Sequence, residues 1–179
     1  EGDFPYTLLN GDDIISDIII GRMSVRSSSQ LATVVNKIIG YEKNYAGETD
    51  WLNTAALVGD PSSSGISTVI TNEYIEGAIN IHGGIEIVNT KYSGSSYDSW
   101  MRTQIDDGVS YLNYRGFYGF SGFTSSDVDA LANGYKLPFL TTLTCDTGSF
   151  YDDNECIAEA LFRAGSAASP KGAIAVVGT

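Results

Sequence analysis

The residue types best suited to covalent chemistry gather around Cys145. An apolar run, LPFLTTLT (137–144), ends directly before this cysteine. A turn of small residues (146–149) follows it, and then comes a helix-like run, CIAEALFRAG (156–165). This order places the thiol at the carboxyl end of a strand, where functional groups lie in open α/β sheets. The pattern predicts a thiolate nucleophile; a small buried hydrophobic side chain is the alternative.

The elements that would position this cysteine alternate along the chain. Six apolar runs are predicted to be strands of a parallel sheet that is covered on both faces, at 17–25, 54–60, 85–92, 109–116, 137–144 and 172–178. Helical spacing of apolar residues predicts helices at 29–44, 66–82, 97–107, 125–133 and 155–165, with caps at 27–29 and at Ser125 or Ser126. Strands and helices that alternate in this way form right-handed βαβ units. We therefore predict an α/β fold, a three-layer sandwich with a mostly parallel sheet flanked by helices, as one domain over residues 1–179.

Several of these segments together resemble the gingipain family of cysteine peptidases. The block around Cys145 reads TC-x-x-G-x-F, then C-x-AEAL-x-RA and GAIA, and an earlier segment reads GR-x-S-x-x-S followed by KIIGYEKNY (37–45). The resemblance implies a caspase-like fold and peptide-bond hydrolysis by a Cys-His dyad with Cys145 as the nucleophile. It also implies a peptide or protein substrate, a secreted or cell-surface location and no required cofactor.

The chain departs from this family at the histidine, which lies in a Gly-His-Gly turn after the strand preceding the cysteine strand. Here Phe117 or Tyr118 occupies that position, and neither ring accepts a proton near neutral pH. The one histidine, His82, ends a helical run and is expected at the opposite edge of the sheet. We hypothesise that a histidine just beyond Thr179 completes the dyad, because the last strand ends at the edge that carries Cys145. The alternative is a degenerate pseudopeptidase that binds a peptide or a partner domain without cleaving it.

Other residues at the same edge fit roles in acyl transfer. By resemblance, the backbone N–H groups of Cys145 and Gly116 would form an oxyanion hole. The alternative for Gly116 is that a tight loop requires glycine for its backbone conformation. A substrate pocket is predicted from Phe117, Tyr118, Asp146 and Asp60. Asp146 would favour a basic side chain before the scissile bond, and a role as a turn or cap residue is the alternative for Asp60.

An acidic loop follows the cysteine turn. Asp152, Asp153 and Glu155 present carboxylates of the kind that bind calcium, and the resemblance makes a structural calcium ion a candidate cofactor. Solvated loop charge is the alternative. A disulfide between Cys145 and Cys156 is left open, because their count permits it but a strand end and a helix start need not meet its geometry.

Composition narrows the class of partner. The chain has 179 residues, 42% of them hydrophobic, and a net charge of −12. Such a charge argues against a nucleic-acid partner, and no apolar segment approaches the length needed to span a bilayer. Because the chain starts and stops without the usual terminal signals, we expect a piece of a larger secreted protein, accompanied by a propeptide or adjacent domains.

Overall fold

The computed structural model describes residues 4–150 and 155–179. Its centre is a five-stranded sheet in the order β2-β1-β3-β4-β5, and every neighbouring pair of strands is parallel. The strands are β1 (Thr54–Gly59), β2 (Ile87–Lys91), β3 (Tyr111–Arg115), β4 (Phe139–Thr142) and β5 (Ala175–Gly178). The predicted parallel α/β sheet is confirmed, with each strand shorter than its apolar run.

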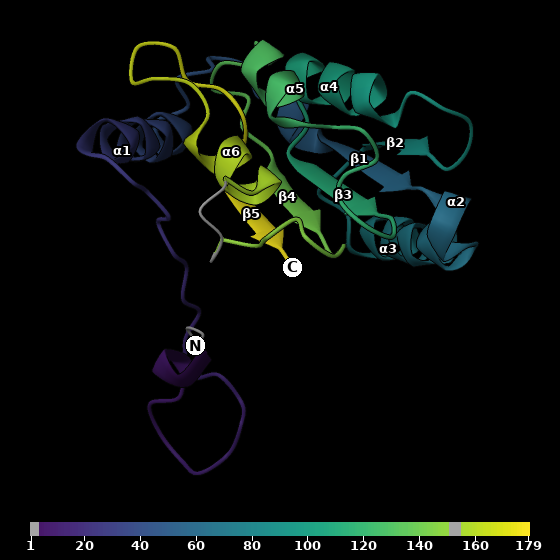
Figure 1. Cartoon of the computed structure of the whole chain (residues 1–179), viewed down its shortest axis with the longest axis horizontal. Coiled ribbons are helices and arrows are strands. Elements are labelled where there is room, and N and C mark those ends of the chain that lie inside the picture. The colour runs from purple at the N-terminus through teal and green to yellow at the C-terminus, as the bar shows by residue number, and fades with distance from the viewer. Residues whose placement is uncertain (1–3, 151–154) are drawn as a thin grey trace.

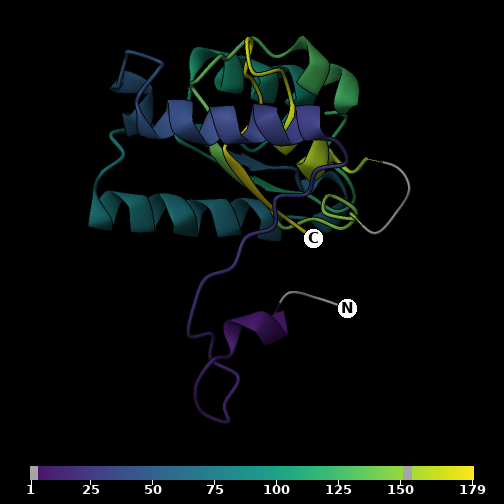
Figure 2. The same ribbon diagram turned by 90° about the vertical axis from the view of Figure 1, so that its left-hand side faces the viewer.

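Helices cover both faces of this sheet, as Figures 1 and 2 show. The helices are α1 (Ser28–Glu42), α2 (Pro61–Ser64), α3 (Ser67–His82), α4 (Tyr97–Asp107), α5 (Ser125–Ala130) and α6 (Ile157–Arg163), and 3-10 turns lie at Phe4–Thr7 and Asp50–Asn53. Helix α3 covers one face, and α4, α5 and α6 cover the other. The three-layer arrangement follows from strands that are apolar on both sides.

The N-terminal caps of helices α1 and α5 can be compared with the caps predicted from the sequence. The Ser27 side chain accepts a hydrogen bond from the Gln30 N–H at 3.2 Å, which confirms the predicted start of α1. The predicted cap of α5 at Ser125 or Ser126 is wrong. Thr124 is the cap, because the Asp127 carboxylate three residues later accepts from its backbone N–H at 2.9 Å and completes a capping box.

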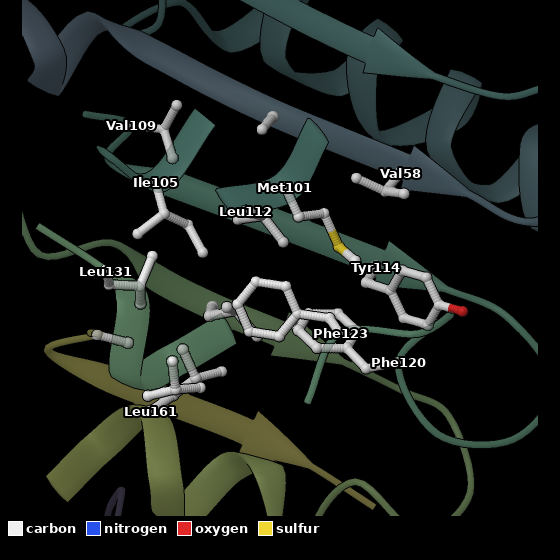
Figure 3. Close-up of a cluster of buried hydrophobic side chains, with 14 of the residues drawn as sticks. Val58, Met101, Ile105, Val109, Leu112, Tyr114, Phe120, Phe123, Leu131 and Leu161 are labelled. Carbon is white, nitrogen blue, oxygen red and sulfur yellow. The ribbon is translucent and has the colours of Figure 1, made fainter. Parts of the chain in front are cut away.

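The core lies between the sheet and helices α4 to α6 (Figure 3). Met101 and Ile105 of α4 pack on Leu112 and Tyr114 of β3, and all four side chains are buried. Burial of each such side chain contributes about 1.5–3 kcal/mol. This packing fixes the sheet, and with it the strand ends that carry the candidate site.

The strand predicted at 17–25 is wrong. This segment has no regular secondary structure, and Ile19 is fully exposed. It borders the same groove of about 730 Å³ as the edge strand β5 but does not join the sheet. An apolar run forms a strand only when a neighbouring strand takes up its backbone N–H and C=O groups, and no strand of the described residues does so here.

Within the described part of the chain, no helix combines the length and the apolar character that crossing a membrane requires.

Candidate active site

Cys145 lies at the carboxyl end of the sheet, three residues after β4, and its side chain is exposed. Its carbonyl accepts a hydrogen bond from the Gly119 N–H at 2.9 Å, and Cys145 forms a parallel bridge with Tyr118. The turn after β3 therefore continues the sheet pairing beyond the strands. This pairing places the exposed thiol directly beside the turn in which Phe117 or Tyr118 stands where the gingipain resemblance would put a histidine.

Gly116 begins that turn, and it is buried. Its N–H donates to the Thr144 hydroxyl at 3.2 Å. A Cβ at position 116 would lie 2.1 Å from the Tyr114 hydroxyl oxygen, so the close approach of that buried ring requires glycine. The predicted oxyanion donor thus has another partner in this structure, and packing alone accounts for the residue type.

Asp60 follows β1 at the same edge and shares a pocket of about 150 Å³ with Phe117 and Tyr118. One carboxylate oxygen caps α2 by accepting from the Ser62 N–H at 3.0 Å, and the other accepts from the Ser121 hydroxyl. Partial burial raises the pKa of Asp60, but the hydrogen bonds from Ser121 and Ser62 outweigh it and hold the pKa below its ordinary value. Asp60 therefore presents a negative charge to this pocket at neutral pH.

A buried tyrosine extends this polar cluster. The Tyr114 hydroxyl and the Ser121 hydroxyl lie 2.5 Å apart, so Ser121 connects Tyr114 to Asp60. Burial raises the pKa of Tyr114, the hydrogen bond with Ser121 lowers it, and the charge of Asp60 raises it, with a net increase. Tyr114 keeps its proton at neutral pH and is a hydrogen-bond donor in this cluster.

Asp146, the fourth predicted pocket residue, lines a different cavity of about 320 Å³ with Phe120, Phe123 and Cys156. Its backbone has a φ of 72°, in the left-handed region, and one side-chain oxygen accepts from the Ser149 hydroxyl at 3.0 Å. Both cavities border the turn 116–123. The four residues predicted to form one pocket therefore line two separate cavities, with Asp146 in one and Asp60, Phe117 and Tyr118 in the other.

The acidic loop is only partly described, because Asp152 and Asp153 lie outside the described residues. The Glu155 carboxylate accepts from the Arg163 guanidinium at 2.9 Å and is already paired. Within residues 4–150 and 155–179, no three His, Cys, Asp or Glu side chains are grouped as a metal ion requires. A structural calcium ion in this loop stays a prediction.

The second cysteine has a different environment from the first. Both thiols are free, and Cys156 is buried where Cys145 is exposed. Burial raises the pKa of the Cys156 thiol, and the backbone N–H groups at the start of α6 offset this only in part. Cys156 is therefore an internal reference for an unreactive thiol.

The one histidine of the chain lies far from Cys145. His82 is the last residue of α3, and Asn72 earlier in that helix donates to the Val58 carbonyl near the carboxyl end of β1. Ten further residues at about 1.5 Å each carry His82 roughly 15 Å toward the opposite edge of the sheet. It cannot serve as a base for Cys145 in this arrangement.

Three residues of the site were missed from the sequence: Ser121, Thr144 and Thr147. The Thr147 hydroxyl donates to the Thr144 carbonyl at 2.7 Å and accepts from the Thr179 N–H at 3.3 Å. It thereby holds the cysteine turn against the end of β5. For Thr144 and Thr147, the available signal was the presence of small hydroxyl residues on both sides of a cysteine after an apolar run.

Comparison with known proteins identifies the family. The sequence matches the family model described as Peptidase family C25 over residues 1–179. The chain belongs to peptidase family C25. Gingipain R2 of Porphyromonas gingivalis is 29% identical over 187 residues, which cover 99% of this chain and 25% of that protein. Gingipain R1 of the same organism is also 29% identical, over 19% of its length.

Solved structures of gingipains have the same fold as this C25 chain. The Arg-specific cysteine proteinase gingipain R (RgpB) has a TM-score of 0.85 and 29% identity, over 97% of this chain and 42% of that one. A complex of the RgpB pro- and mature domains also gives a TM-score of 0.85, over 98% of this chain and 44% of that one. These matches confirm the gingipain resemblance and the caspase-like fold. The C25 chain spans about a quarter or less of the curated relatives and less than half of the solved chains.

Proposed function

We propose that this chain supplies the nucleophile of a cysteine endopeptidase, with the Cys145 thiolate attacking the carbonyl carbon of a peptide bond. The supporting observation is an exposed thiol at the carboxyl end of β4, beside the turn 116–119, in a chain of a peptidase family. A carbon–sulfur bond forms while the carbonyl electrons move to oxygen. The carbon–nitrogen bond then breaks, the leaving amine takes a proton from the conjugate acid of the base, and water hydrolyses the thioester.

The oxyanion that forms in this reaction needs preorganised N–H donors. We assign this role to the N–H groups of Cys145 and Gly116. Because the Gly116 N–H donates to the Thr144 hydroxyl here, substrate must displace that hydroxyl before the second donor is available. A 3.2 Å hydrogen bond between neutral groups contributes only about 0.5–1.5 kcal/mol. The free energy of substrate binding is therefore sufficient to replace the Thr144 hydroxyl with the oxyanion as the partner of the Gly116 N–H.

We propose that the base comes from outside residues 1–179, since His82 is the only histidine and lies at the far edge of the sheet. The position of Thr179 supports this assignment. Its carbonyl accepts from the Gly148 N–H at 2.9 Å, which brings the end of β5 to the cysteine turn. We propose that residues following Thr179 in a longer polypeptide, or a neighbouring domain, present the base to Cys145.

We further propose a basic side chain before the scissile bond. One solved relative is described as an Arg-specific cysteine proteinase. In this chain the Asp146 carboxylate and the rings of Phe120 and Phe123 line one cavity of about 320 Å³. A carboxylate together with aromatic faces favours a cationic group. A secreted or cell-surface location is also proposed, on the strength of the gingipain relatives.

The test is intact mass spectrometry of the full-length polypeptide after incubation with an irreversible peptidyl cysteine-protease inhibitor that ends in arginine. We expect one adduct on Cys145, retained in Cys156→Ala and lost in Cys145→Ala. Buried Cys156, whose pKa is raised, is the internal control for non-specific alkylation. Absence of an adduct on folded protein would contradict a working nucleophile.

A second candidate function rests on Phe117. Phe117 is 64% exposed and precedes Tyr118, which pairs with Cys145. One of these two residues stands where the gingipain resemblance puts the histidine. An exposed aromatic side chain at the mouth of a pocket supports peptide binding without proton transfer. In that case the protein binds an arginine-containing peptide, leaves it uncleaved over days, and shows no inhibitor adduct. Calorimetry with the peptide and chromatography of the same sample distinguish the two functions.

A further inference from the structure

Helix α3 carries a row of large apolar side chains on the side that faces away from the sheet. The row consists of Ile66, at the cap of the helix, and Ile70, Tyr74 and Ile81 within it. Each of these four residues is between 55% and 80% exposed. Gly77 belongs to the same row, because positions three and four apart lie on one side of a helix. These five residues are called the α3 row below.

Hydrogen bonds to the sheet fix the rotation of α3, so that the α3 row stays outside. The buried Asn72 amide donates to the Val58 carbonyl at 3.0 Å, and the Asn113 amide donates to the Asn72 side-chain oxygen at 2.8 Å. Val69 is buried on this inner side. The helix is therefore apolar on two opposite sides, whereas an ordinary surface helix has one apolar side. Soluble monomers rarely expose a contiguous apolar patch unless it binds something.

The α3 row is complementary in shape to a second copy of itself that runs antiparallel. Ile70 precedes Tyr74 by four residues, and Gly77 precedes Ile81 by the same interval. A twofold axis between Tyr74 and Gly77 therefore sets Tyr74 against the partner's Gly77, and Ile70 against the partner's Ile81. A Cβ at position 77 would meet no atom within 4 Å, so the glycine leaves open space for the ring. A large side chain that enters such a space is a knob-into-hole contact between packed helices.

The residues on both flanks of the α3 row also permit this pairing. Glu73 and Asn80 lie along one flank, and the same axis brings Glu73 to the partner's Asn80, whose amide is a hydrogen-bond donor. Thr71 and Ala78 lie along the other flank and meet across the axis. Neither flank sets two carboxylates opposite each other. This matters in a chain with a net charge of −12, because self-association requires a surface without like charges in contact.

We propose that two copies of this chain associate through the α3 row, with the helices antiparallel and a twofold axis between Tyr74 and Gly77. Helix α3 follows β1 and returns from the carboxyl edge of the sheet to the amino edge. Antiparallel helices therefore place the two Cys145 edges at opposite ends of the dimer, where both stay accessible. An interface of one helix from each copy is small, so the dimer should dissociate on dilution.

Sedimentation velocity of the full-length polypeptide over a range of concentrations tests this interface. Gly77→Leu should weaken the dimer by at least about tenfold, because the new side chain fills the space that receives the Tyr74 ring. The single subunit should tolerate this change, since position 77 is open and leucine favours a helix more than glycine does. Thr103→Leu, at an exposed position of α4, is the matched control and should leave the dimer intact.

A charge exchange tests the antiparallel orientation. Asn80→Glu sets a carboxylate against the partner's Glu73 and should weaken the dimer. Combining Asn80→Glu with Glu73→Lys replaces this repulsion with an ion pair and should restore the dimer. In a parallel pair, positions 73 and 80 do not face each other. A double variant as weak as Asn80→Glu alone would therefore overturn the antiparallel arrangement.

Two other results would overturn the interface itself. The first is a monomer at every concentration of the full-length polypeptide. The second is a dimer whose dissociation constant is unchanged by Gly77→Leu, because another surface then holds the two copies together. Circular dichroism of each variant establishes that it is folded. The inhibitor adduct on Cys145 is scored in the same samples, so that failure of the interface and failure of the peptidase assignment are distinguishable.

Discussion

Arg163 is a buried charge whose removal has a calculable consequence. Its side chain is 4% exposed, and its guanidinium donates to the carboxylates of Glu159 and Glu155 and to both oxygens of Ser24. Glu159 is also buried, and its remaining partners are the Ser24 hydroxyl at 2.5 Å and Arg26 at 3.4 Å. The pair joins α6, which follows the cysteine loop, to the segment that precedes α1.

Replacing Arg163 with Met should leave the Glu159 carboxylate desolvated without its main partner. Breaking a buried pair in this way costs about 3–5 kcal/mol of unfolding free energy. For a domain of this size each kcal/mol shifts the melting temperature by roughly 2–4 °C, so the Tm should fall by roughly 6–20 °C. The double variant Arg163→Met/Glu159→Met removes both charges and keeps the volume, and it should recover most of that loss.

The assay is urea unfolding followed by circular dichroism, with the four proteins of the cycle measured under one condition. Glu155→Ala is the control, because Glu155 is 39% exposed and its pair with Arg163 should contribute about 1 kcal/mol or less. A loss below about 1 kcal/mol for Arg163→Met would show that the charge is not desolvated. A double variant as unstable as the sum of its singles would refute the coupling of the two residues.

Three further predictions concern α1 and the turn beside the cysteine. Burial lowers the pKa of Lys37 to about 7, so the unfolded state binds more protons from about pH 7 to about pH 10 and the free energy of unfolding should rise with pH across that window. Lys37→Met should abolish this rise in urea titrations, and a rise of equal size in the variant would exclude Lys37 as its source. Gly116→Ala should destabilise the protein by about 1–3 kcal/mol, because the added Cβ lies 2.1 Å from the hydroxyl oxygen of buried Tyr114. Thermal unfolding measures this loss, and an unchanged melting temperature would mean that the ring moves freely. Phe117→His should speed iodoacetamide alkylation of Cys145 near neutral pH at least about tenfold by supplying a base, whereas an unchanged rate would show that position 117 does not reach the thiol.

Much of the fold could be predicted from the sequence. Apolar runs of strand length, separated by amphipathic helices, allow few topologies once right-handed crossovers are required, and five of the six predicted strands are present. The run at 17–25 is rich in apolar residues like the others, but it borders a groove beside β5 and does not join the sheet. Composition reports that a segment prefers burial, whereas strand formation also requires a neighbouring backbone.

The candidate site, like the fold, could be predicted from the sequence only in part. The place of Cys145 at a strand end and the absence of a nearby histidine follow from residue order alone. The bond from the Gly116 N–H to Thr144, the separation of Asp146 from Asp60, and the link from Asp60 to Ser121 were not predictable. Asp60 and Ser121 are 61 positions apart in the chain. Local patterning determines which elements form and at which edge their ends lie. The partners of individual polar groups depend on how distant loops pack against one another, and only the tertiary structure decides that.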